Sequence, residues 1–197
     1  MPQKKPMWGR FLRRSVAFTV SVFVGILLTT VPVVSGEWDE ELFRATRDSD
    51  LEAMKEAIRK GANVNEKDPY GSTPLIYAAE SGNCDCAKIL IDNGADANVR
   101  NIPALTPLII ASKEGNVALT KMLLNSGADP DLRGGYGWTP LMMAVWYGEL
   151  ETAKALLDGK ADVNAQNNYG KTALDVAEAY EKAEMVHLLK GAGAGEK

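Results

Sequence analysis

The sequence predicts an all-α solenoid of about five helix-turn-helix units joined by hairpin loops. One observation is the tripeptide Thr-Pro-Leu, which recurs every 33 residues, at 73–75, 106–108 and 139–141 and as Thr-Ala-Leu at 172–174. A second is the pair Gly-Ala, which keeps the same period at 61–62, 94–95, 127–128 and 193–194, with Lys-Ala at 160–161. Two sequence motifs that recur with the same 33-residue period indicate a stacked repeat protein, whose units bury their apolar faces against one another.

Within each unit, the pattern predicts a helix, a tight turn, a second helix and a loop. In the second unit, Thr73 suits the N-cap of the first helix, and Pro74 then falls at the first helical position, where its missing N–H costs nothing. Gly82 stands where this helix should end. Apolar residues at helical spacing over 84–91 predict the second helix, which Gly94 ends.

The two ends of the repeat region have the character of caps. The first unit lacks Thr-Pro but keeps register, which predicts helices at 39–47 and 51–60. In the last unit, Glu181, Lys182 and Lys190 replace Gly or apolar residues, as expected of a face that meets water. The sequence therefore predicts ten helices in five units, at 37–67, 68–100, 101–133, 134–166 and 167–197.

These residues closely resemble the ankyrin repeat, whose signature is T-P-L-H-x-A. The shared elements are Thr-Pro-Leu, the Ala three residues after the Leu, the Gly-Asn pairs at 82–83 and 115–116, and the closing phrases at 94–98 and 161–164. The resemblance covers about residues 39–194. It implies a preformed stack that recognises other proteins with its hairpin tips and the exposed ends of its first helices.

The chain departs from that pattern at several positions. The His after Thr-Pro-Leu is replaced in every unit, so any hydrogen bond that it makes is absent; the replacements are Ile76, Ile109, Met142 and Asp175. Ala104 stands where a turn Gly is usual, which predicts a distorted hairpin turn there. Lys160 replaces a Gly that ends a helix.

The charge of the repeat region is acidic. The whole chain has 22 basic and 26 acidic side chains, and residues 37–197 keep 17 and 26 of them, a formal net charge of −9. Nucleic acid needs a path of Lys and Arg across its phosphates, so this composition disfavours nucleic-acid binding and equally an anionic membrane surface. About 160 residues form one domain with a continuous core.

Residues 1–36 follow another plan. A basic head that contains Arg13-Arg14 precedes an apolar run from Val16 to Leu28, and small residues lie near Ser35 and Gly36. This predicts a signal peptide or, as the alternative, a retained membrane anchor over 16–34, which is just long enough to cross a bilayer. In both cases the repeats lie outside the cytosol, either exported (periplasmic or secreted) or membrane-anchored. The Arg pair also leaves open a twin-arginine export route.

The sequence contains no pattern of catalytic or ligand-binding residues. His187, the one histidine, shares its repeat position with four lysines, so it is expected in solvent. Cys84 and Cys86 lie two apart on one helix, point to different faces and are expected as small buried residues. We therefore predict no catalytic residue, no cofactor and no metal site, and a protein that is not an enzyme.

Binding residues are predicted from the repeat positions that the core does not require. The fourth unit alone places four aromatic side chains there. With their neighbours they give the candidate partner-binding set Tyr70, Leu105, Lys113, Glu114, Tyr136, Trp138, Trp146, Tyr147, Tyr169 and Tyr180. Clustered Trp and Tyr are typical of binding hot spots. The competing interpretation is that Trp146 and Tyr147 pack against the next unit and that Trp138 covers the hairpin.

Together these observations predict a non-catalytic protein–protein interaction module that acts outside the cytosol as a monomer. It would bind an unidentified protein partner through its concave face and hairpin tips, and would touch a membrane only through residues 16–34. The alternative is an acidic inhibitor or immunity-type protein that blocks a basic enzyme or toxin, which rests on charge alone. A retained anchor would instead make the repeats a scaffold beside a membrane complex.

Overall fold

A computed structural model of the chain describes residues 36–195, and it contains the ten predicted α-helices. They form five pairs, each with a short inner turn: α1 (Glu37–Asp48) with α2 (Leu51–Arg59), α3 (Pro74–Glu80) with α4 (Cys84–Asp92), α5 (Pro107–Lys113) with α6 (Val117–Asn125), α7 (Pro140–Tyr147) with α8 (Leu150–Asp158), and α9 (Ala173–Ala179) with α10 (Ala183–Gly191). A single 3-10 turn, η1 (Gly135–Gly137), lies in one hairpin.

The first helices of the second to fifth units, α3, α5, α7 and α9, begin where the sequence predicts, at the residue after the repeated Thr. Thr106 and Thr139 cap α5 and α7 by accepting hydrogen bonds from the backbone N–H of Ile109, at 3.1 Å, and of Met142, at 3.3 Å. Thr73 also occupies an N-cap position, but its side chain makes no capping hydrogen bond, so α3 depends on Pro74 and on packing to fix its start.

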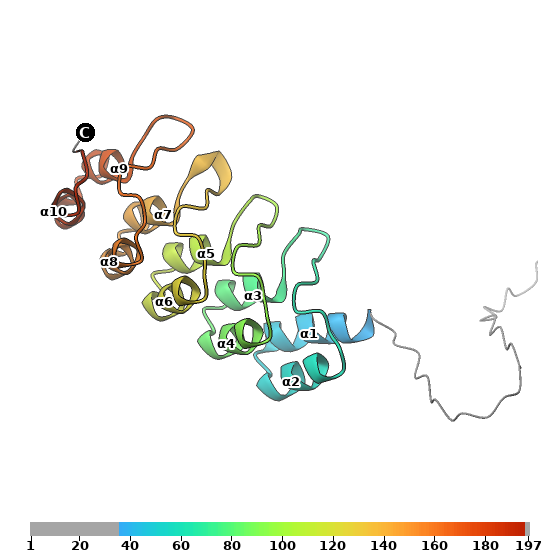
Figure 1. The fold of residues 1–197 in the computed structure, drawn as a ribbon. Helices are drawn as coiled ribbons and strands as arrows, with labels where there is room; N and C mark the ends of the chain where they lie inside the picture. Colours follow the sequence, from blue (N-terminus) through green and yellow to red (C-terminus); the bar gives the residue numbers. More distant parts are fainter. Residues whose placement is uncertain (1–35, 196–197) are drawn as a thin grey trace, which may run out of the picture. The chain divides into compact units, whose positions relative to one another are not determined.

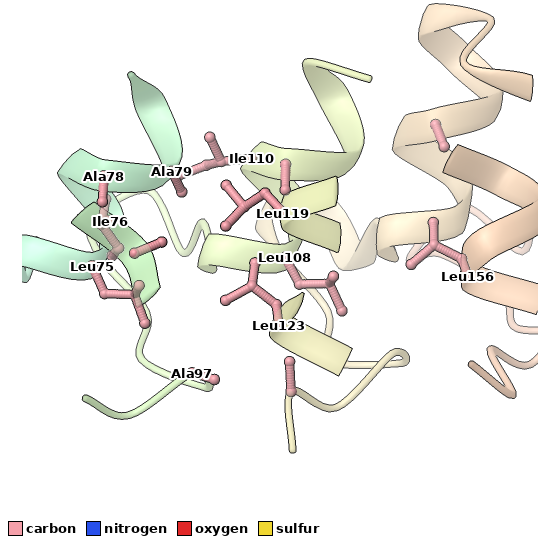
Figure 2. Packing of buried hydrophobic residues seen from close by; sticks show 14 of the residues in the cluster. Leu75, Ile76, Ala78, Ala79, Ala97, Leu108, Ile110, Leu119, Leu123 and Leu156 are labelled. Carbon is pink, nitrogen blue, oxygen red and sulfur yellow. The ribbon is translucent and has the colours of Figure 1, made fainter. Parts of the chain in front are cut away.

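The pairs stack side by side in two rows (Figure 1). The odd-numbered helices α1 to α9 form one row, the even-numbered helices α2 to α10 form the other, and long hairpin loops project from one side of the stack. A continuous apolar core runs between the rows, and Figure 2 shows Leu75 and Leu108 within it. Leu141 is buried at the equivalent position of the next unit. Truncating such a leucine to Ala typically costs about 2–5 kcal/mol, so these positions hold the stack together.

Asparagine side chains join the loops that follow the second helices of consecutive units. Asn98 accepts a hydrogen bond from the backbone N–H of Asp129 at 2.7 Å and donates one to the carbonyl of Gly127 at 3.0 Å. Asn65 and Asn164 make the equivalent pair of bonds to the loops that follow them. Asp131 occupies the equivalent position between the third and fourth units. Its carboxylate can only accept hydrogen bonds, so the bond that the Asn side chain donates elsewhere is missing there.

The hairpin turns are organised by their first residue. Asp68 and Asn167 accept hydrogen bonds from backbone N–H groups two and four residues later, and Asn101 accepts one from the residue four later. The fourth unit has Gly134 instead, which offers no side-chain acceptor. There the turn becomes η1, and Tyr136 adopts a left-handed φ of 58°.

The expectation of a distorted turn at Ala104 is wrong. Its backbone N–H donates to the Asn101 carbonyl at 2.5 Å, as Gly71 does to Asp68 at 2.9 Å, so the turn keeps its form. Ala104 instead adopts a left-handed φ of 73°, a conformation that costs an L-residue about 1–2 kcal/mol. Lys160, which replaces a glycine at the end of a helix, also adopts a left-handed conformation, with φ of 70°.

Two hairpin junctions carry a backbone hydrogen bond between neighbours. The N–H of Ile102 donates to the carbonyl of Tyr70 at 2.8 Å, and the N–H of Asn168 donates to the carbonyl of Tyr136 at 3.0 Å. At the junction between them, the equivalent groups are the N–H of Gly135 and the carbonyl of Pro103. No hydrogen bond within residues 36–195 uses either of these two groups.

The predicted signal peptide or anchor lies outside the described residues. Over residues 36–195, every helix is too short or too polar to cross a bilayer.

Candidate functional site

An apolar groove of about 290 Å³ opens between the third and fourth units. The hairpins and the first helices of those two units line it. We call it the aromatic groove, and its residues are Pro103, Leu105, Ile109, Gly134, Gly135, Tyr136, Trp138, Met143, Trp146 and Tyr147. Five of them belong to the partner-binding set that the sequence predicts. The groove therefore brings together the residues that the fourth unit contributes to that set, with Leu105 from the third unit.

The floor of the groove is part of the protein core. Ile109 is 1% exposed, and a methyl group placed on Gly134 would lie only 2.8 Å from its Cδ1 atom. A side chain at this position would displace the end of Ile109 and crowd the Ala104 carbonyl at 3.2 Å, so glycine suits the close approach of the hairpin to α5.

Trp146 is the centre of the aromatic wall. Its ring meets Trp138 edge-on, with centroids 5.3 Å apart, and Tyr180 of the next unit, with centroids 4.5 Å apart. Trp146 nevertheless remains 40% exposed and Tyr147 47% exposed, while Trp138 is half-buried against the core. The rings of Trp138 and Trp146 thus pack on their neighbours, as the competing interpretation expects, and Trp146 and Tyr147 still present an apolar face to solvent, where binding by these residues stays a prediction.

Tyr136 extends the aromatic surface along the hairpin tips. Its ring stacks on Tyr169 of the next hairpin, with centroids 6.2 Å apart and an angle of 28° between the planes. Both rings are about two-thirds exposed. Their stacking makes a flat apolar face beside the groove, held by the backbone hydrogen bond between the two hairpins.

Lys113 and Glu114 form a polar rim at the end of α5. The Lys113 ammonium pairs with the Glu114 carboxylate at 3.0 Å and lies 5.7 Å from the centre of the Tyr147 ring. The hydrogen bond from Lys113 to Glu114 and the carboxylate charge together raise the pKa of Lys113. The ammonium therefore stays charged above the face of Tyr147, where a cation is favourable.

Tyr70 does not belong to this surface. It lines a separate hollow of about 750 Å³ with residues of α1, among them Phe43 and Arg47. There Tyr77 meets Phe43 edge-on at 5.8 Å, and its hydroxyl donates to Asp68 at 2.6 Å. The predicted aromatic strip is thus interrupted: it is continuous from Leu105 to Tyr180, and the exposed Ile102 and Pro103 of the second hairpin lie between it and Tyr70.

Five groove residues lie outside the predicted set. Pro103 and Gly135 occupy hairpin-tip positions, whereas Ile109, Gly134 and Met143 were missed by reasoning from the repeat positions. Ile109 and Met143 have the helical spacing of core residues, and only the tertiary packing shows that they also form the groove floor. Gly134 was missed because nothing marks a glycine as a floor residue. Gly134 could have been noticed because it replaces the Asp or Asn with which the other hairpins begin.

The polar residues considered for chemistry are scattered. His187 is exposed, Cys84 is half-buried, and Cys86 is buried, which raises the pKa of its thiol; neither cysteine forms a disulfide. Throughout 36–195, no three His, Cys, Asp or Glu side chains gather closely enough to hold a metal ion. The aspartates of the loops accept backbone hydrogen bonds, as Asp96 does from Asn98 at 2.8 Å.

Comparison with known proteins agrees with this architecture. A family model described as "Ankyrin repeats (3 copies)" matches residues 39–101 and 108–196, which is most of the chain. No curated protein matches the sequence. The period of 33 residues, the Thr-Pro-Leu helix starts, the five stacked pairs and this match lead to one conclusion. The chain belongs to the ankyrin repeat family and is a protein–protein interaction module.

Proposed function

We propose that this protein binds a protein partner through the aromatic groove and the hairpin tips beside it, as a monomer and without catalysis. The observation that carries the proposal is the exposure of Tyr136, Trp146 and Tyr147 around an apolar hollow. Exposed aromatic residues in a preformed hollow are the usual source of binding energy in protein interfaces. Because the stack is already ordered, little conformational entropy is lost when a partner docks.

The test is a capture experiment followed by quantitative binding. Residues 37–197 serve as bait, and the affinity of the captured partner is measured by calorimetry for the wild type, Tyr147→Ala and Tyr70→Ala. We expect Tyr147→Ala to weaken binding at least tenfold, since truncated hot spots cost more than about 1.4 kcal/mol. Tyr70→Ala, in the separate hollow, serves as the matched control. A partner that tolerates Tyr147→Ala and loses affinity with Tyr70→Ala would refute the proposal.

The location of the repeats outside the cytosol is also proposed. It is supported by the basic head, apolar run and small residues of 1–36. A C-terminal reporter that is active only outside the cytosol should be active when fused to the full chain. The mass of the mature protein then separates the two alternatives, because a chain that starts at Glu37 has lost a signal peptide and an intact chain keeps its anchor.

A second candidate function is inhibition of a basic enzyme or toxin. The net charge of −9 over residues 37–197 supports it, since opposite charge accelerates association. Many of the acidic side chains already pair with Lys or Arg on the same helix, as Glu52 does with Lys55 at 2.6 Å. An association rate that falls steeply as salt is raised would favour this function, whereas an apolar groove contact changes mainly the dissociation rate.

A further inference from the structure

We infer that the ligand of the aromatic groove is a proline-rich segment in the polyproline II conformation. This inference rests on the proposed function and specifies the chemistry of the partner. It follows from two properties of the groove that are independent of its being apolar. One is the backbone left unpaired at its edge, and the other is the excess of hydrogen-bond donors on its walls.

The unpaired backbone lies at the junction between the second and third hairpins. At the neighbouring junctions, Ile102 and Asn168 donate across to the preceding hairpin. At this junction the equivalent donor, the N–H of Gly135, has no acceptor among the described residues, although its backbone lies close to the Pro103 carbonyl. Both residues line the groove. The Gly135 N–H and the Pro103 carbonyl are therefore both left to pair with the backbone of a ligand.

The walls add further donors. The indole N–H groups of Trp138 and Trp146 and the phenol groups of Tyr136 and Tyr147 make no hydrogen bond to any described residue. With Gly135 they give five donors, whereas the Pro103 carbonyl is the main acceptor in addition to the phenol oxygens. A ligand that matches this lining presents carbonyl oxygens and few N–H groups. Proline is the residue that does so, because it keeps the backbone carbonyl and lacks the backbone N–H.

The shape of a polyproline II helix also suits the groove. Such a helix has three residues per turn and no internal hydrogen bonds, so its carbonyls remain available to donors on the protein. Its rings pack on aromatic faces, here those of Tyr136, Trp146 and Tyr147, at little cost in conformational entropy. An α-helical ligand already uses its carbonyls in its own hydrogen bonds. An extended strand presents one N–H for every carbonyl, and the groove has few acceptors for those N–H groups.

The test is a titration with short peptides, followed by tryptophan fluorescence and calorimetry. A capped peptide of ten prolines is compared with a capped Gly-Ser peptide of the same length and with a capped Ala-rich helical peptide. We expect only the proline peptide to bind saturably. Tyr136→Phe should weaken it about fivefold, the effect of one net hydrogen bond, and Trp146→Ala at least tenfold. Tyr70→Phe, at the equivalent position of the first hairpin, should leave affinity unchanged.

Two results would overturn the inference: absence of saturable binding of the proline peptide up to millimolar concentration, or tighter binding of the helical peptide. Tyr136→Phe is informative even if Trp146→Ala folds poorly, because the Tyr136 hydroxyl has no partner in the described structure and its removal leaves the ring stacked on Tyr169. If a captured partner depends on Tyr147 while the proline peptide fails to bind, the proposed function stands and this inference falls. If the captured partner ignores Tyr147, the proposed function itself fails.

Discussion

The Asp131 carboxylate accepts a hydrogen bond from the backbone N–H of Asp162 at 2.8 Å, between the third and fourth units. Asn98, one unit earlier, makes the same bond and a second one, from its amide N–H₂ to the Gly127 carbonyl. Asp131 has no N–H₂ group with which to make the second bond. Burial raises its pKa, and the nearby charges of Asp162 and Asp129 raise it further.

We predict that Asp131→Asn stabilises the fold by about 1 kcal/mol at pH 7, through one added hydrogen bond to the Lys160 carbonyl and removal of a poorly solvated charge. The gain depends on pH. A carboxyl whose pKa is raised on folding contributes stability below its ordinary value of 3.8, and this contribution is lost as the pH rises through the folded pKa. The advantage of Asn should therefore be larger at pH 7 than at pH 3 in urea unfolding.

The matched control is the reverse change in the preceding unit. Asn98→Asp should lower the free energy of unfolding by about 1 kcal/mol at pH 7, because it removes the bond to Gly127. If Asp131→Asn and Asn98→Asp change stability in the same direction, the amide link is not the cause.

Ala104→Gly should raise the melting temperature by about 2 °C. Glycine removes the cost of the left-handed φ of 73°, about 1–2 kcal/mol, and gives back about 0.5–1 kcal/mol through its greater unfolded-state entropy. For a domain of this size, 1 kcal/mol shifts the melting temperature by about 2–4 °C. Calorimetry of Ala104→Gly beside Gly71→Ala, whose φ is also 73°, should show opposite shifts. Parallel shifts would contradict the backbone explanation.

Asp175→Ala should cost about 1 kcal/mol at pH 7, measured by chemical unfolding. Thr172 and Asp175 form a capping box at the start of α9, with the Thr172 N–H donating to the carboxylate at 2.7 Å. That bond, and the one from the Thr172 hydroxyl, lower the pKa of Asp175. The stabilisation is thus present above the ordinary pKa of 3.8 and is lost as the pH falls through the folded value.

The control for the capping box is Glu178→Ala, an exposed change on the same helix, which should stay within about 0.5 kcal/mol of the wild type. Loss of equal stability by both variants would show that α9 tolerates no change at all, and the role of the cap would be refuted.

Trp146 and Tyr180 should be energetically coupled. Their ring centroids are 4.5 Å apart across two units, so a double-mutant cycle with Ala at both positions should give a coupling of about 0.5–1.5 kcal/mol in urea unfolding. Trp146→Ala alone therefore lowers stability as well as partner affinity, whereas Tyr147→Ala separates the two effects. Additive single changes would show that the ring contact contributes nothing.

The helices were predictable from the sequence because local signals and the period agree. Thr106, Pro107 and Gly115 mark the start and the end of α5 without reference to any other unit, and 33-residue spacing then places its neighbours. The left-handed Tyr136 was not predictable in the same way. It accompanies the loss of the turn acceptor at Gly134, where the other three hairpins have Asp or Asn.

The aromatic groove was predicted only in part, for a physical reason. Repeat positions tell which side chains leave the core, and Tyr136, Trp146 and Tyr147 are indeed exposed. They do not tell which hollows separate neighbouring units. Tyr70 was joined to the strip, but it lines a separate hollow with Phe43 and Arg47 of α1, a helix that no hairpin precedes among the described residues.

The position of Ile109 has a consequence for how partner preference can change. Ile109 is 1% exposed and also lines the proposed binding groove, so it serves the interior and that surface at once. Substitutions at the bottom of the hollow must therefore preserve the core as well as suit a ligand, whereas Tyr136 and Tyr147, which are largely exposed, can change with less effect on the fold. Selectivity in this molecule can be retuned from its sides with the scaffold left intact.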